Sequence, residues 1–254
     1  MRSLLKYRKA PLPGSFQPVQ AEAPDLHNAA IAAVYYGQRR GGDFYDFVRV
    51  APNRVVFGLL DVAGIQEENR EIVAAAQMTF REGSCELFSA ESVNEADAMI
   101  ELCLRLNRTI LSAAGRVCPC PAFAGCFEEE LGTVCYFSAG HIPGLVRDAS
   151  GLSELPATGL PLGLFSHSTC DASVVALAPG AALLLVSRGV IEARRKTEDY
   201  GWERVRSSFQ SSGAESAKEI CISVLAGVHD FMGTPPTHND VTALALLRDG
   251  IQEN

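Results

Sequence analysis

Short apolar runs recur along the chain and predict β-strands. The clearest is 55–61 (VVFGLLD), whose nearly continuous apolar character is typical of a strand covered on both faces. Runs 31–36 and 44–50 are rich in β-branched and aromatic residues, which favour strands. Further strands are predicted at 122–127, 133–138, 144–147, 173–177, 181–187 and 241–247.

Four other segments have the spacing of helices. Between Ser92 and Gly115, apolar side chains recur every three or four residues, and Ser92 with Glu95 forms the pattern of a capping box. Gly115 marks the end of this helix. The other helices are predicted at 69–82, about 202–210 and about 215–232.

The order of these elements predicts the fold class. Strands come first, then a helix pair, more strands, a second helix pair and a closing strand, which is not the alternation of a parallel doubly wound sheet. An α+β fold of two packed antiparallel sheets with helix pairs on the outer faces, an α-β-β-α sandwich, buries these strands on both sides. We expect one domain over residues 25–250, preceded by a Pro-, Gly- and Gln-rich arm or linker at 1–24 and followed by a tail at 251–254.

Composition narrows the choice of partners and location. The 254 residues carry a formal net charge of −8, which argues against a nucleic-acid partner. The apolar stretch near the N-terminus is too short for a signal peptide, and no run reaches the roughly 18 apolar residues that a membrane span needs. None of the eight cysteines forms a C-x-x-C pair. We therefore expect a cytoplasmic protein with buried, reduced thiols and no membrane association.

Three aspartates flank predicted strands. Asp43 stands at the mouth of one strand, Asp61 ends the buried run, and Asp240 opens the last strand. A carboxylate at the end of an apolar strand is costly unless it is hydrogen-bonded, paired or metal-bound. If the strand ends converge, the oxygen cluster suits Mg²⁺ or Mn²⁺ and hydrolysis of a phosphoester. Taken singly, Asp43 as a turn residue and Asp240 as a loop cap are equally good interpretations.

In combination, these segments resemble a known family. The chain is similar to PPM-type (protein phosphatase 2C-like) serine/threonine phosphatases of the SpoIIE/RsbU branch, which act in bacterial signalling. The similarity covers about residues 28–248. The matching stretches, in chain order, are Gly41–Asp46, Gly58–Gly64, Ser138–Leu145, Gly159–Gly163, Leu184–Ala193 and Asn239–Thr242.

The resemblance implies an α-β-β-α sandwich with a centre for one or two Mn²⁺ or Mg²⁺ ions at one end of the sheets. By position, Asp43, Asp61 and Asp240 match catalytic metal-site aspartates, with Asp61 as the bridging ligand, and the backbone carbonyl of Val62 matches a further ligand. The implied substrate is a phosphoserine or phosphothreonine in a phosphorylated protein, in this family typically a small anti-sigma-factor antagonist.

The sequence departs from the family at the site. Arg188 stands where the family usually has a metal-ligating aspartate, so a carboxylate is replaced by a guanidinium that cannot ligate a cation. Asn239 replaces the first residue of an Asp-Asp pair, and Ile65 follows Gly64 in place of the usual Lys or His. Arg188 then pairs with Asp61 or Asp240.

Two interpretations follow from these departures. In one, the aspartates still hold one metal and Arg188 contacts the substrate phosphate. In the other, the site is degenerate and the domain is a protein-binding regulatory module. The departures favour loss of at least one metal position, because a cation and a guanidinium repel each other in a small acidic pocket.

Three other features are candidates for chemistry. His141 could be a general acid, but its place beside a predicted turn favours a hydrogen-bonded turn residue. His238 and the basic run 194–196 could meet a phosphate or an acidic partner, and a solvated position is favoured for both.

Overall fold

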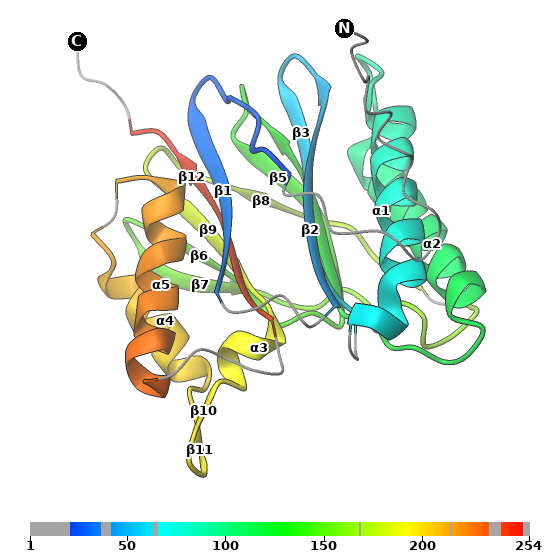
Figure 1. Cartoon of the computed structure of the whole chain (residues 1–254). Coiled ribbons are helices and arrows are strands. Elements are labelled where there is room, and N and C mark those ends of the chain that lie inside the picture. Colours follow the sequence, from blue (N-terminus) through cyan, green and yellow to red (C-terminus); the bar gives the residue numbers. More distant parts are fainter. Residues whose placement is uncertain are drawn as a thin grey trace, which may run out of the picture.

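Two five-stranded antiparallel sheets lie face to face, with a helix pair on the outside of each (Figure 1). The computed structural model describes residues 21–36, 42–62, 66–167, 169–213, 215–233 and 240–250, with backbone only at 66–68. Most of the predicted arm and all of the predicted tail lie outside these residues. The α-β-β-α sandwich predicted from the sequence is confirmed.

Each sheet mixes strands that are distant in sequence. The first has the order β2 (Gly42–Ala51), β3 (Arg54–Val62), β4 (Ala122–Glu128), β5 (Thr133–Ala139) and β8 (Ser173–Ala176). The second has the order β1 (Ala29–Tyr36), β12 (Val241–Arg248), β9 (Ala182–Val186), β6 (Gly144–Asp148) and β7 (Gly151–Leu155).

The helices differ from the prediction mainly at their ends. Helices α1 (Gln66–Phe88) and α2 (Glu95–Ala114) cover the first sheet, and α4 (Trp202–Ser211) and α5 (Ala217–Met232) lie outside the second (Figure 1). Helix α1 extends beyond the predicted 69–82 in both directions. None of the helices in the described part of the chain combines the length and apolar character that a bilayer span requires.

The capping box predicted for α2 is wrong. The N-cap is Asn94, two residues after Ser92. The Asn94 side chain accepts a hydrogen bond from the Asp97 backbone N–H at 3.3 Å, and its amide donates to the Asp97 carboxylate at 2.6 Å. These two hydrogen bonds satisfy groups of the first helical turn, as a capping box does, so a cap from Ser92 is not needed. The end at Gly115 is as predicted, with φ 58° in the left-handed region.

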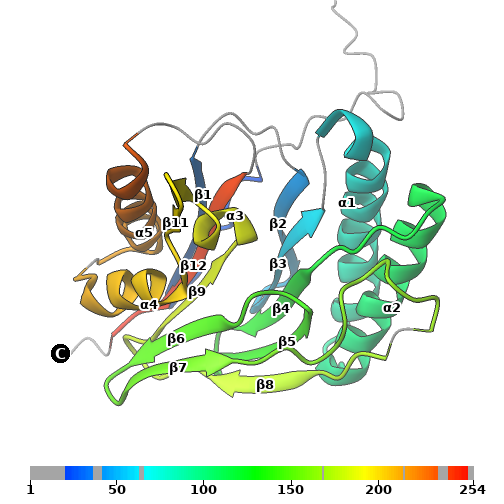
Figure 2. The ribbon, with the colours of Figure 1, turned by 90° about the horizontal axis from the view of Figure 1, so that it is seen from below.

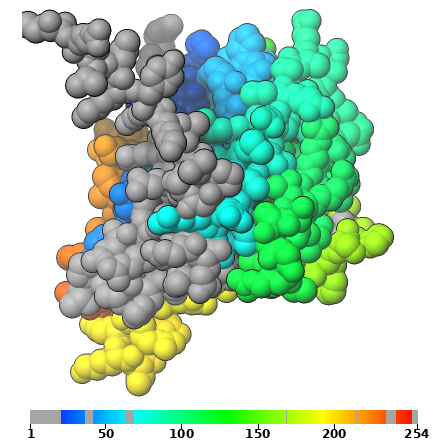
Figure 3. Space-filling view, turned by 45° about the vertical axis from the view of Figure 1, so that its right-hand side comes forward, coloured from blue at the N-terminus to red at the C-terminus, as the bar shows by residue number. Residues whose placement is uncertain are grey.

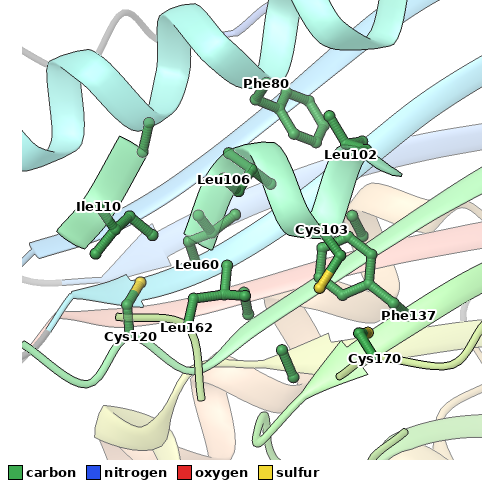
Figure 4. Packing of buried hydrophobic residues seen from close by; sticks show 14 of the residues in the cluster. Leu60, Phe80, Leu102, Cys103, Leu106, Ile110, Cys120, Phe137, Leu162 and Cys170 are labelled. Carbon is green, nitrogen blue, oxygen red and sulfur yellow. The ribbon is translucent and has the colours of Figure 1, made fainter. Parts of the chain in front are cut away.

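Six of the eight cysteines lie in one apolar layer between the first sheet and the pair α1–α2. All eight are free thiols, and of these only Cys85 is exposed. Figure 4 shows Cys103 and Cys170 side by side where α2 meets the loop before β8. Burial raises the pKa of Cys135 to about 11, so this thiol stays protonated at neutral pH. The six are Cys103, Cys118, Cys120, Cys126, Cys135 and Cys170.

A buried carboxylate fixes α1 on the sheet. Asp46 on β2 is fully buried and accepts hydrogen bonds from Gln77 at 3.1 Å and from Arg81 at 2.5 and 2.9 Å. The backbone N–H of Phe47 also donates to it, at 2.8 Å. This network joins the middle of α1 to the strand that begins with Gly42 and Asp43.

We expect Asp46→Ala to lower the free energy of unfolding by about 2 kcal/mol, because it leaves the buried Gln77 amide without its acceptor. Arg81 is half exposed and water replaces part of its lost pairing. Urea unfolding monitored by circular dichroism measures the change. Glu86→Ala, which removes an exposed partner of Arg105 on the same helix pair, serves as the control and should leave the midpoint unchanged. Equal effects of the two variants would contradict the role given to Asp46.

Candidate active site

Four strand ends meet at one end of the sandwich, the end viewed in Figure 2. Asp43 near the start of β2 lies directly opposite Asp61 near the end of β3 in the antiparallel register. In the other sheet, Asp240 precedes β12 and Ser187 follows β9. Because side chains alternate along strands and both Phe44 and Leu60 face the helix layer, Asp43 and Asp61 face the space between the sheets.

Hydrogen bonds join the two sheets at this point. The backbone N–H of Asp43 donates to the carboxylate of Asp240 at 3.3 Å, and the Thr242 hydroxyl donates to the Asp43 carboxylate at 2.8 Å. These residues are about 200 positions apart in the sequence. The strand ends converge, and the fold therefore brings Asp43, Asp61 and Asp240 to one site.

Two hydroxyl residues support the carboxylates, and the sequence alone did not identify them. The Ser187 hydroxyl donates to the backbone carbonyl of Asp240 at 3.2 Å and accepts from the backbone N–H of Thr242 at 3.1 Å. Both side chains are buried. A signal for Thr242 existed, because residues two apart on a strand share a face and Thr242 lies two positions after Asp240.

The buried setting disfavours the charged forms of Asp43 and Asp61. Burial, and then the neighbouring charges of Asp61 and Asp240, hold the pKa of Asp43 well above its ordinary value. Burial also raises the pKa of Asp61, while the Arg188 guanidinium and a hydrogen bond from the Arg188 backbone N–H oppose this rise. A bound cation would relieve the same repulsion that protonation relieves.

Arg188 pairs with Asp61, which selects one of the two partners that the sequence left open. It is the first residue of α3 (Arg188–Ile191), a single turn that follows β9 directly. Its Nε lies 3.6 Å from a carboxylate oxygen of Asp61 and 3.7 Å from one of Glu192. The side chain is 45% exposed, so part of the guanidinium faces solvent at the mouth of the site.

The carbonyl of Val62, a suggested metal ligand, has a partner in α1. The side-chain amide of Asn69 donates to it at 3.4 Å, and Asn69 is fully buried. This contact could not be predicted from the sequence, because an amide in the first turns of a helix has many ordinary roles.

The fit to a metal ion differs across the site. The carboxylates of Asp43, Asp61 and Asp240 are oxygen donors of the kind that Mg²⁺ and Mn²⁺ prefer. As these side chains stand, each is directed at a protein partner, and within the described ranges no three His, Cys, Asp or Glu side chains are grouped to hold a metal. At the position of Arg188 a cation does not fit, because a guanidinium has no lone pair to offer.

Several expected residues lie outside the part of the chain that the structure describes. They are Gly64, Ile65, His238 and Asn239. The assignments of Asp43, Asp61, Val62, Asp240 and Arg188 as functional residues stay predictions.

His141 lies at the same end, buried in the short connection between β5 and β6. Its Nδ1 is 2.8 Å from the Ile142 carbonyl, which only accepts, so Nδ1 carries the proton. Burial lowers the pKa of His141 to about 4, so the ring is neutral at pH 7. The hydrogen bond agrees with the prediction of a hydrogen-bonded residue, although the backbone here is a short connection and not a turn.

The His141 pKa predicts an acid-dependent loss of stability. The unfolded histidine, with its pKa near 6.5, binds more protons than the folded one between about pH 6.5 and pH 4. Stability therefore falls with decreasing pH, and this group accounts for about 2 kcal/mol between pH 7 and pH 5. We expect His141→Asn, which keeps a donor near Nδ1, to remove this part of the dependence in urea unfolding at the two pH values. His167→Asn, at an exposed position, is the control, and a wild-type slope in His141→Asn would refute the assignment.

Comparison with known proteins identifies the class. The family model described as "Stage II sporulation protein E (SpoIIE)" matches residues 51–249. The chain belongs to this family, the SpoIIE/RsbU branch of PPM-type phosphatases.

Individual relatives are distant in sequence. The RsbU and RsbW domains of Rv1364c from Mycobacterium tuberculosis align over 94% of this chain and 65% of that chain, with 22% identity and a TM-score of 0.74. The SiaA-PP2C domain of Pseudomonas aeruginosa aligns over 86% of each chain, with 17% identity and a TM-score of 0.72. Protein IcfG of Synechocystis sp. (strain ATCC 27184 / PCC 6803 / Kazusa) is 22% identical over 89% of this chain, which spans only 39% of that protein.

Proposed function

We propose that the chain is a metal-dependent phosphatase that removes phosphate from phosphoserine or phosphothreonine in a bacterial signalling protein. The observation that carries this proposal is the convergence of Asp43, Asp61 and Asp240 from both sheets. Burial raises the pKa of Asp43 and of Asp61, and repulsion from the neighbouring carboxylates raises that of Asp43 further, which a bound cation would offset. Membership of the SpoIIE family supports the same reaction.

The residues present fit one divalent ion better than two. Asp43, Asp61, Asp240 and the Val62 carbonyl would hold Mn²⁺ or Mg²⁺, which when bound lowers the pKa of a coordinated water and polarises the phosphoryl group. Thr242 orients the Asp43 carboxylate, and Ser187 holds the backbone of Asp240, through the hydrogen bonds described above. Arg188 holds Asp61 in place, and its solvent-facing side is positioned to donate to a substrate phosphate.

A second function is supported by the same arginine. Arg188 stands where the family has a ligand, and the described carboxylates already bond to protein groups. A domain with such a site is a candidate for a regulatory module that binds a phosphorylated partner without hydrolysing it.

The family supports a proposal for the class of partner. The relative from Mycobacterium tuberculosis joins an RsbU domain to an RsbW domain in one protein. We propose for this chain a phosphorylated regulatory protein of the anti-sigma-factor antagonist type. The free thiols of the core support action in the reducing cytoplasm.

Hydrolysis of p-nitrophenyl phosphate and of a phosphoserine peptide by the purified chain tests the proposal. We expect activity with Mn²⁺ or Mg²⁺ and none in EDTA. A folded protein that is inactive with every divalent ion and shows no heat of Mn²⁺ binding would overturn the enzyme proposal. Retained affinity for a phosphorylated partner would then support the regulatory module.

A further inference from the structure

A small basic hairpin extends from the end of the molecule that carries the site. It consists of β10 (Arg194–Arg195) and β11 (Glu198–Asp199), paired antiparallel, with Lys196 in the turn at φ 59°. Residues 194–199 are all exposed. Figure 1 shows the hairpin extending below α3, and Figure 3 shows it projecting from the body (yellow).

The base of the hairpin is held firmly. The backbone N–H of Tyr200 donates to the Ala193 carbonyl at 2.7 Å, which closes the loop. The Arg195 guanidinium lies over the ring of Phe231 at 4.9 Å, and that of Arg204 lies over the same ring at 4.8 Å. An exposed segment anchored in this way is preorganised, so a partner that binds it pays little to order it.

The hairpin is close to the site along the chain and in space. Only Glu192 and Ala193 separate it from α3, whose first residue, Arg188, pairs with Asp61. In the view onto the site, the hairpin lies beside α3 and α5 (Figure 2). A protein bound at the carboxylates would therefore pass over or beside it.

Its charge is unusual for this chain, which carries a formal net charge of −8. The acidic side chains of the hairpin are already paired, Asp199 with Arg194 at 2.7 Å and Glu198 with Arg204. Arg195 and Lys196 have no ion pair with any residue that the structure describes. Positive charge is thus available on the hairpin, at Lys196 in the turn and at Arg195 beside it, close to a site whose own carboxylates repel anions.

We propose that Arg195 and Lys196 form a docking surface for acidic side chains that flank the phosphorylated residue of the protein substrate. The inference rests on the proposed function, since it names the substrate class of the same site. Exposed charge pairs contribute modestly to affinity but strongly to encounter, and their effect weakens with salt. The hairpin would compensate for repulsion between an acidic phosphoprotein and the acidic site.

The test compares Arg195→Gln/Lys196→Gln with Arg108→Gln/Lys218→Gln, which removes equal charge from exposed positions on α2 and α5. The substrates are two phosphoserine peptides, one with acidic and one with neutral flanks, and p-nitrophenyl phosphate. For the hairpin variant we expect kcat/KM on the acidic peptide to fall about five- to tenfold, through a higher KM. At high salt, the hairpin variant and the wild type should no longer differ. Hydrolysis of the other two substrates should stay at the wild-type rate. Equal behaviour of both variants on the acidic peptide would overturn the proposal.

Binding separates this proposal from the enzyme proposal. Fluorescence anisotropy measures the affinity of the same two labelled peptides for the chain with no turnover required. Suppose that the wild type hydrolyses neither peptide but still binds the acidic one more tightly, in a way that depends on Arg195 and Lys196. That result would support the docking proposal and overturn the enzyme proposal. Lys196→Gln alone leaves Arg195 over Phe231. If this variant loses affinity for the acidic peptide by about two- to threefold, unfolding of the hairpin is excluded as the cause. Unchanged peptide affinity in Lys196→Gln, together with a lowered melting temperature of the double variant, would count against docking.

Discussion

Asp61→Asn is expected to reduce phosphoester hydrolysis about 10²- to 10³-fold, because it removes the carboxylate that lies between Asp43 and Arg188 at the centre of the site. A neutral amide is a weaker ligand and compensates no positive charge. Mn²⁺ affinity, measured by isothermal titration calorimetry, should fall with the rate. Initial rates at saturating metal give the loss of turnover separately from the loss of metal.

The same substitution should not destabilise the metal-free fold. Burial raises the pKa of Asp61, which means that its charged form costs stability in the folded state. We therefore expect a thermal midpoint in EDTA equal to or above that of the wild type. Asp249→Asn, an exposed site just after β12 at the far end of the sandwich, makes the same chemical change and should alter neither property. Full activity in Asp61→Asn would show that the chemistry lies elsewhere.

The strands with long apolar runs were predicted from the sequence, whereas three short strands, β7, β10 and β11, were not. Strand β3 is buried along almost its whole length, and its apolar run was sufficient to locate it. Strand β7 has the sequence GLSEL with a single buried residue, and β10 and β11 are entirely charged. These strands form by main-chain pairing and by the closure of turns, which leave no apolar period in the sequence.

The site was predictable where a residue conflicts with its surroundings. A carboxylate at the end of an apolar strand is such a conflict, and Asp61 was found for that reason. Ser187 and Asn69 were not found, because a hydroxyl or an amide at the end of an element satisfies ordinary local needs. The partner of Arg188 was also beyond the sequence, since it depends on the single turn α3 that directs the backbone and side chain toward Asp61.

Arg188→Asp is expected to raise Mn²⁺ affinity at least about tenfold, because it exchanges a cation for a carboxylate beside Asp61 and changes the local formal charge by two units. Without metal, the variant places another anion next to carboxyls whose pKa values are already raised, so we expect a lower thermal midpoint in EDTA. Added Mn²⁺ should restore that midpoint more than it does in the wild type. Calorimetry gives the number of ions bound, which we expect to increase.

Arg188→Gln distinguishes the two roles that the arginine can have. This substitution removes the positive charge but adds no carboxylate. It therefore separates the loss of repulsion between Arg188 and the metal ion from the gain of a metal ligand. If Arg188 contacts the substrate phosphate, Arg188→Gln lowers kcat/KM while metal binding changes little, and Arg188→Asp lowers it further. If Arg188 fills a former metal position, Arg188→Asp binds an additional ion and gains turnover that Arg188→Gln lacks. Wild-type metal binding and wild-type rates in both variants would mean that Arg188 has neither role, and its pairing with Asp61 would then be structural only.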